Sequence, residues 1–139
     1  MVALARPFPR DPSSWNQVIP LTDLSPSLDQ AVDRLHELSL LGDDWDGYGS
    51  PRITTSARET AFALLSTMRS YAAMPSMQLD PVSGGGLQFA WEFGPRGLEV
   101  EVLPNGCVEV LAVDGDQMTE GALEDPRRML ELLQWLLRS

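Results

Sequence analysis

The chain has 139 residues, the length of about one domain, and its 43% hydrophobic and 22% charged residues are an ordinary globular balance. Cys107 and His36 are the only cysteine and histidine, which excludes an intrachain disulfide, a zinc site with two thiolates and a His-rich metal centre. No apolar run reaches the ~20 residues that span a bilayer, and prolines interrupt the start too early for a signal peptide. We therefore expect a cytoplasmic protein with no membrane segment.

The charge is strongly negative. Ten arginines and no lysine stand against twenty acidic residues, which gives a net charge of -10, and between residues 80 and 124 only Arg96 opposes nine acids. Nucleic-acid affinity comes largely from Lys and Arg at phosphates, so this charge argues against direct nucleic-acid binding and against anionic membranes. It favours a protein partner with a basic surface, although solubility alone would also account for it.

Residues 1–25 are rich in proline, with aromatic and branched residues between the prolines. Proline at this density prevents a helix and favours an extended path. We expect an arm that lies in a groove of its own domain or of another chain, followed by a single domain over residues 26–139.

Two helices are expected after the arm. The first begins near Ser25 or Ser27, ends near Gly42 and carries an apolar stripe at helical spacing: Leu28, Ala31, Val32, Leu35 and Leu38. The second begins at a cap among residues 54–56, runs to about Ala73 before Pro75, and has a stripe of Ala57, Ala61, Leu64, Leu65, Met68 and Ala72.

The apolar period then changes to two, which is typical of strands. Alternating residues predict strands over 86–93, 97–103 and 107–113, and glycine-rich turns at 94–97 and 104–106 join them as hairpins. Residues 76–82 are a candidate for a further edge strand, although Pro81 limits how well this strand can pair. A last helix follows Pro126, and it is apolar on more than one face. We predict an α+β fold in which an antiparallel meander of three to four strands packs against two N-terminal helices and one C-terminal helix.

The connection over residues 41–53 is the most distinctive stretch. One interpretation is a cation loop, because Ca²⁺ prefers clustered carboxylate and carbonyl oxygens. Counted from Asp44, however, the later ligand positions of an EF-hand hold Tyr48, Ser50 and Arg52, and no glutamate closes the loop. The structural interpretation has aspartates capping turns and two aromatic residues filling the space between the helices. The residues concerned are Asp43, Asp44, Trp45, Asp46 and Tyr48.

This loop and the stretch Gly86-Leu87-Gln88-Phe89-Ala90-Trp91 together resemble a group of small uncharacterised bacterial and phage proteins. Those proteins pair a Trp-Asp-Gly-x-Gly loop with a Gly-x-x-x-x-Trp strand and a short meander. The resemblance covers roughly residues 35–113 and leaves the arm and the last helix outside it. It implies the same fold but no activity, and it carries over no catalytic residue.

Glutamates form the second feature of interest. Strand parity places Glu99 and Glu101 on one face of the meander, with Glu92 and Glu109 on neighbouring strands of that face. One interpretation is a negative platform for an Arg- or Lys-rich partner. The other is an ordinary solvated sheet face, and the sequence does not fix the register that would separate the two.

Enzyme motifs are weak. No Gly-x-Ser-x-Gly elbow accompanies His36, nothing in the spacing brings Cys107 to His36, and residues 84–86 lack the ending of a phosphate loop. No cofactor, metal or catalytic residue is implied. We expect a non-enzymatic acidic interaction module, of antitoxin, immunity or inhibitor type, with Trp15 or Trp135 as an apolar anchor. The alternatives are a ligand-binding or catalytic domain that uses the loop at 43–48, and a subunit that self-assembles into a homo-oligomer through its last helix.

Overall fold

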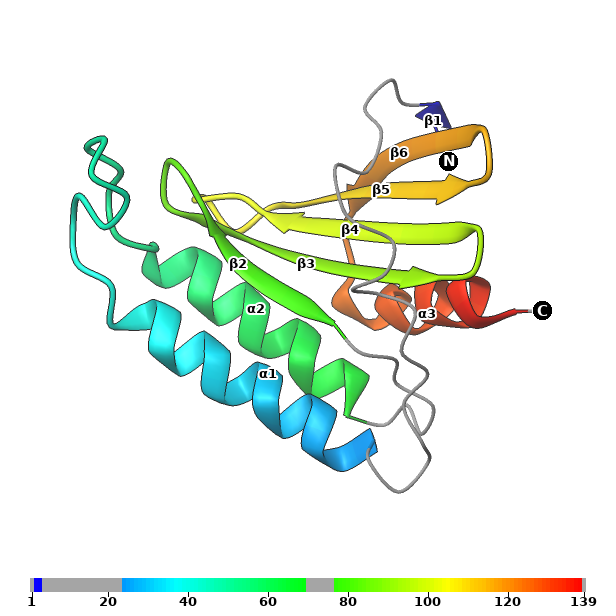
Figure 1. Ribbon diagram of the computed structural model, residues 1–139, viewed down its shortest axis with the longest axis horizontal. Helices are drawn as coiled ribbons and strands as arrows, with labels where there is room; N and C mark the ends of the chain where they lie inside the picture. Colours follow the sequence, from blue (N-terminus) through cyan, green and yellow to red (C-terminus); the bar gives the residue numbers. More distant parts are fainter. Residues whose placement is uncertain (1, 4–23, 70–76, 139) are drawn as a thin grey trace.

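The computed structural model describes residues 2–3, 24–69 and 77–138, and it shows an α+β fold with helices against an antiparallel sheet (Figure 1). The expected α+β class is therefore confirmed. In chain order the elements are β1 (Val2–Ala3), α1 (Leu24–Ser39), α2 (Thr55–Met68), β2 (Gln78–Val82), β3 (Gly86–Phe93), β4 (Arg96–Val102), β5 (Val108–Asp114), β6 (Gln117–Leu123), the 3₁₀ turn η3 (Pro126–Arg128) and α3 (Met129–Leu137).

The meander is longer than predicted. Strands β2 to β6 follow one another as antiparallel neighbours, and the two-residue β1 adds to the outer edge of β6, in the order β1-β6-β5-β4-β3-β2. The prediction of three to four strands was too low because β6 reads Gln-Met-Thr-Glu-Gly-Ala-Leu, without the apolar alternation of a half-buried strand. Its two-residue turn, Gly115-Asp116, has a φ of 60° at Gly115 and is nevertheless a tight turn of the kind that joins hairpins.

The core lies between one face of the sheet and the helices. We call this side the inner face, and its strand residues share one apolar cluster with all three helices: Leu79, Leu87, Phe89, Trp91, Leu98, Val100, Val102, Val108, Val110 and Ala112. Phe89 and Trp91 stack with ring centroids 6.0 Å apart and both are fully buried. Burial of each large side chain stabilises the fold by about 1.5–3 kcal/mol.

Thr54 connects the start of α2 to two turns of the sheet. Its Oγ1 accepts from the backbone N–H of Ala57 at 3.0 Å, which confirms it as the helix cap, and donates to the carbonyl of Pro104 at 2.6 Å. Its own N–H donates to the carbonyl of Gly85 at 3.1 Å. The helix ends at Met68, earlier than predicted, and residues 70–76 lie outside the described part of the chain.

The last helix buries one side and keeps its other apolar residues half-covered. Met129, Leu133 and Leu136 are fully buried, while Leu132 and Trp135 pack against the core at its margin. The start of this segment is built as the sequence suggests, since Asp125 caps η3 by accepting from the N–H of Arg127 at 3.0 Å and Pro126 follows. Within the described residues the large hydrophobic side chains that are mostly exposed are Leu40 and Tyr48, neither of which belongs to α3.

Candidate functional site

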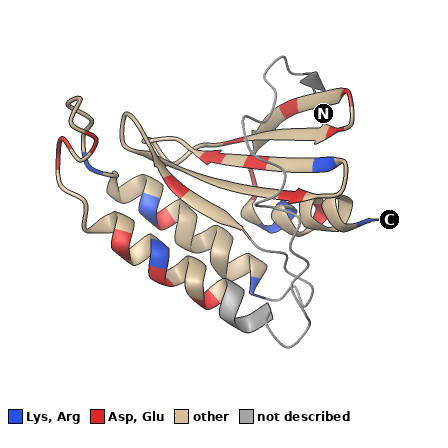
Figure 2. Ribbon diagram, in the orientation of Figure 1, with Lys and Arg blue, Asp and Glu red and all other residues tan. Residues whose placement is uncertain are grey.

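The face of the sheet opposite the helices carries the acidic residues. Cα partners across neighbouring strands share a face, so the register assigns six carboxylates to this outer face: Asp80, Glu92, Glu99, Glu101, Glu109 and Glu120. Strands β1 to β6 contain a single basic residue, Arg96 at the start of β4. Arg96 is paired with Asp114 of β5, and its register places it on the inner face. Figure 2 shows acidic segments across the strands with one basic segment on β4, and the helices and their flanking segments carry both signs of charge.

Glu101 and Glu109 are direct neighbours on this face. They are paired across β4 and β5, and in the described part of the chain neither has an ion-pair partner. Glu101 is half-buried and Glu109 is exposed, as is Glu120 on β6. Two like charges opposite one another destabilise a sheet by a few tenths of a kcal/mol to about 1 kcal/mol. This pair therefore slightly weakens the fold.

Glu99 differs from its neighbours because it is only 3% exposed. It lies in register between Ala90 and Leu111, which are 5% and 2% exposed, so the middle of this row is buried, although Glu120 at its β6 end is exposed. In this conformation the carboxylate of Glu99 does not reach the surface. The apolar residues at outward positions, Ala90 and Leu111, were the sequence signal that this row would be buried.

The other residues that the sequence predicted to contact a partner lie in different surroundings. Glu92 is half-buried on β3 opposite Gly97, and Trp15 lies outside the described residues. Trp135 is half-buried, with the Arg96 guanidinium 5.4 Å from its ring centroid. Arg96 Nη1 also donates to the carbonyls of Trp135 and Arg138, each at 2.6 Å, which stabilises the C-terminal end of α3. Trp135 thus takes part in the internal packing of the fold.

The loop between α1 and α2 uses its three aspartates to fix its own backbone. Asp43 Oδ1 accepts from the N–H of Arg52 at 3.0 Å, and Asp44 Oδ1 accepts from the N–H of Gly49 at 2.6 Å. Asp44 also adopts a φ of 63°, in the left-handed region that aspartate tolerates better than most residues.

Asp46 is the most connected of the three carboxylates. Its Oδ1 accepts from the N–H of Tyr48 at 2.9 Å, and its Oδ2 accepts from the hydroxyl of Ser50, which in turn contacts the hydroxyl of Ser83 at 2.7 Å. The hydrogen bond from Ser50 is the main cause that lowers the pKa of Asp46. The backbone N–H and guanidinium of Arg52 likewise lower the pKa of Asp43. The two carboxylates are therefore held in their charged form by local donors.

The two aromatic residues of the loop do not behave alike. Trp45 is half-buried and its Nε1 donates to the carbonyl of Pro51 at 3.1 Å. Tyr48 is 92% exposed, so the expectation that it fills the space between the helices was wrong. The hydrogen bonds on Asp46 turn the backbone so that Tyr48 projects into solvent, and Leu40 is also 85% exposed.

Among the described residues, no group of three or more His, Cys, Asp or Glu side chains is arranged to hold a metal ion. His36 packs against Phe62 with ring centroids 5.4 Å apart. This contact gives the imidazole a packing role beside the apolar stripe of α1. Among the helices of the described ranges, none has the length and apolar character that crossing a bilayer demands. Two surface cavities, of about 250 Å³ beside β2 and about 230 Å³ beside β6, are lined by residues outside the loop at 43–48.

Comparison with known proteins gave no similarity: no family model, no curated protein and no solved structure matches this chain.

Proposed function

We propose that this chain is a non-enzymatic, acidic protein-binding module that acts in the cytoplasm and engages a basic surface of another protein, in the manner of an antitoxin, immunity protein or inhibitor. The observation that carries the proposal is the Glu101–Glu109 pair. These carboxylates face one another across two strands and lack an ion-pair partner among the described residues. A partner that supplies Arg or Lys there would remove the repulsion and gain an ion pair.

The mechanism is electrostatic steering followed by local contact. A net charge of -10 attracts a cationic protein from a distance, and the outer face sets the orientation of the encounter through Glu101, Glu109 and Glu120, with Glu92 at its far end. Such an interaction depends on ionic strength, because exposed charges are screened beyond a Debye length of about 10 Å at 0.1 M salt.

Co-purification from the native cell tests the proposal. A tagged chain with Glu101→Gln and Glu109→Gln is compared with the unmodified chain for the basic protein that elutes with it. The matched control is Glu37→Gln with Glu59→Gln, which alters two exposed glutamates of α1 and α2 and changes the net charge equally. We expect the sheet variant to lose most of the captured partner and the helix variant to retain it. Equal capture by all three chains would contradict the proposal.

A further inference from the structure

The loop between α1 and α2 presents one aromatic side chain to solvent on a backbone that is fixed on both sides of it. The N–H of Tyr48 donates to Asp46 Oδ1 at 2.9 Å. The N–H of Gly49 donates to Asp44 Oδ1 at 2.6 Å, and the N–H of Gly47 donates to the carbonyl of Asp44 at 3.1 Å. The side chain of Tyr48 is 92% exposed. Because the backbone is already ordered, binding through this ring restricts only two side-chain torsions.

The space beside this ring is open. A Cβ built on Gly47 or on Gly49 meets nothing within 4 Å, so the domain covers neither neighbour of Tyr48. Leu40 is the other large hydrophobic side chain that is mostly exposed among the described residues, and it lies directly after α1, before the hydrogen-bonded part of the loop. A partner can therefore reach the ring of Tyr48 without any rearrangement of the loop.

The loop is attached to the end of the sheet that carries the Glu101–Glu109 pair. Ser50 Oγ lies 2.7 Å from a hydroxyl of the β2–β3 turn, and Thr54 Oγ1 donates to a carbonyl of the β4–β5 turn at 2.6 Å. A single register pair separates the β4–β5 turn from Glu101 and Glu109. The loop and both turns thus lie at the same end of the sheet (Figure 1).

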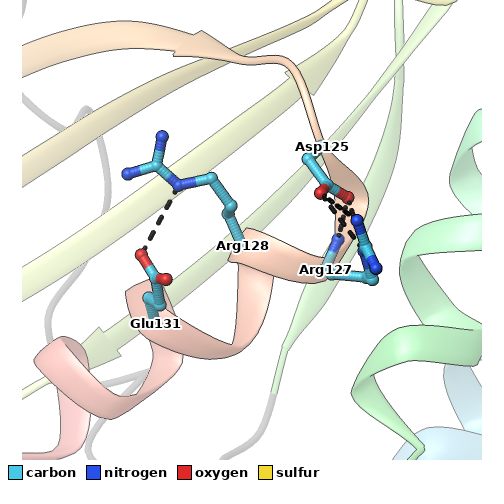
Figure 3. Close-up of polar contacts among 4 residues, drawn as sticks. All are labelled: Asp125, Arg127, Arg128 and Glu131. Atoms are coloured by element: carbon cyan, nitrogen blue, oxygen red, sulfur yellow. Dashed lines mark hydrogen bonds and ion pairs between the residues drawn. The ribbon is translucent and has the colours of Figure 1, made fainter.

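The start of α3 carries charges of a different kind. Asp125 pairs with Arg127 at 2.9 Å, and Glu131 pairs with Arg128 at 3.5 Å (Figure 3). Each of these two acids already has an arginine of the same chain beside it, whereas the acidic pair on β4 and β5 has no ion-pair partner among the described residues. An incoming cation therefore gains more at the loop end of the sheet than beside α3.

Arginine is the side chain that suits an exposed ring near unpaired carboxylates. The face of an aromatic ring attracts a cation, and a planar guanidinium can stack on the ring while its N–H groups remain free to donate. The lysine ammonium is a more strongly hydrated point charge. The chain makes such a contact internally, where the Arg96 guanidinium lies 5.4 Å from the ring centroid of Trp135. The net charge of -10 also attracts a cationic segment from a distance.

We propose that the ring of Tyr48 and the Glu101–Glu109 pair form one binding surface for an arginine-rich segment of a partner protein. One guanidinium stacks on Tyr48, and a second pairs with the two glutamates. Asp44 and Asp46 are positioning residues, because they hold the backbone that carries the ring. The inference rests on the proposed function in that the partner is basic, and it names arginine as the recognised residue and Tyr48 as the anchor.

A ten-residue peptide of alternating arginine and serine tests the surface, because it spans roughly 33 Å when extended. The matched probe has lysine in place of arginine, and calorimetry at low salt compares the two. We expect Tyr48→Ala to bind the arginine peptide about 3-fold more weakly than the parent does and to lose less affinity for the lysine peptide. Tyr48→Phe keeps the ring and should bind like the parent. The inference is overturned if the parent binds neither peptide, or if Tyr48→Ala changes both affinities equally.

Leu40→Ala is the control for the loss of an exposed apolar side chain. It should leave both affinities unchanged, and a loss of arginine-peptide affinity as large as that of Tyr48→Ala would show that the effect is not specific to the ring. Thermal unfolding should be nearly the same for the parent and both variants, because the two side chains are 92% and 85% exposed.

The double variant Glu101→Gln with Glu109→Gln separates this inference from the proposed function. It should weaken the binding of both peptides, since it removes the carboxylates that either cation contacts. If Tyr48→Ala binds both peptides as the parent does, recognition of arginine by the ring is wrong, and the proposed function still stands when the double variant loses the native partner. If the double variant retains both the peptides and the native partner, both proposals fail.

Discussion

The loop at residues 43–46 and the outer face of the sheet are both acidic, yet their carboxylates are used in opposite ways. Asp43, Asp44 and Asp46 each accept a backbone N–H within the loop. Glu101 and Glu109 face one another and have no ion-pair partner among the described residues. The first group shapes the backbone, whereas the second slightly weakens the sheet.

An acidic residue is therefore informative only together with the donors and charges around it. A cluster of aspartates in a glycine-rich loop invites a cation-binding hypothesis, but these three are arranged to receive N–H donors. Strand glutamates are commonly solvent-exposed and of no further consequence, but two of these repel one another, and no described residue neutralises them. Of these two regions, the outer face is therefore the one whose carboxylates lack an ion-pair partner among the described residues.

Substitution of a loop aspartate should lower the stability of the fold more than the other changes considered below. Asp44→Ala removes the acceptor for the Gly49 N–H and places alanine at a φ of 63°, which together should lower the free energy of unfolding by about 1–2 kcal/mol. Asp44→Asn keeps an acceptor and tolerates the same φ, so it should lose much less. Urea denaturation of the three chains measures the difference, and equal losses for both variants would show that the hydrogen bond does not matter.

Acid titration separates the two groups of carboxylates next. The pKa of Asp43 and of Asp46 is lowered in the folded chain, so their stabilisation is present above the ordinary aspartate pKa of about 3.9 and is lost as pH falls through the lowered values. The gap in urea midpoint between the parent and Asp46→Asn should therefore be constant near neutral pH and shrink below about pH 4. A gap that does not change with pH would contradict this role for Asp46.

On the sheet the sign should reverse. Glu101→Gln with Glu109→Gln removes a like-charge pair and should raise the free energy of unfolding by a few tenths of a kcal/mol to about 1 kcal/mol. The gain should shrink in high salt, where the repulsion is already screened. Thermal unfolding at low and high salt gives the comparison. A destabilised double variant would mean that these glutamates support the fold.

The smallest effect is expected at the tip of the loop. Tyr48 is 92% exposed, so Tyr48→Ala should change the free energy of unfolding by no more than about 0.5 kcal/mol. The N–H of residue 48 still donates to Asp46 in that variant. A loss well above this value, measured by urea denaturation, would show that the ring packs against the domain after all.

Local chemistry made much of this fold predictable from the sequence. The alternation of apolar and polar residues predicted the bounds of β3 and placed Glu92, Glu101 and Glu109 on one face of the sheet. Thr54, the cap of α2, was among the three candidate caps. These features depend on neighbours in the chain or on a period of two. They need no knowledge of what packs on top of them.

The features that were missed depend on tertiary context. β6 lacks alternation because an edge strand next to a cavity does not need it, and its Gly115-Asp116 turn was the available signal. Glu99 is buried together with its register neighbours Ala90 and Leu111, and strand parity alone gives the face of a residue but not its burial. Tyr48 was expected to be buried as an aromatic residue, but the hydrogen bonds of Asp46 direct it outward.

The association rate with the co-purified basic partner, measured by stopped flow over a range of salt, decides whether the outer face attracts that partner. For the parent chain we expect the rate to fall steeply with salt, and for Glu101→Gln with Glu109→Gln to be about 3- to 10-fold lower at low salt with a flatter dependence. The helix control, Glu37→Gln with Glu59→Gln, should keep the parent's slope. If the two double variants lose rate equally, net charge rather than the outer face attracts the partner and the account is contradicted.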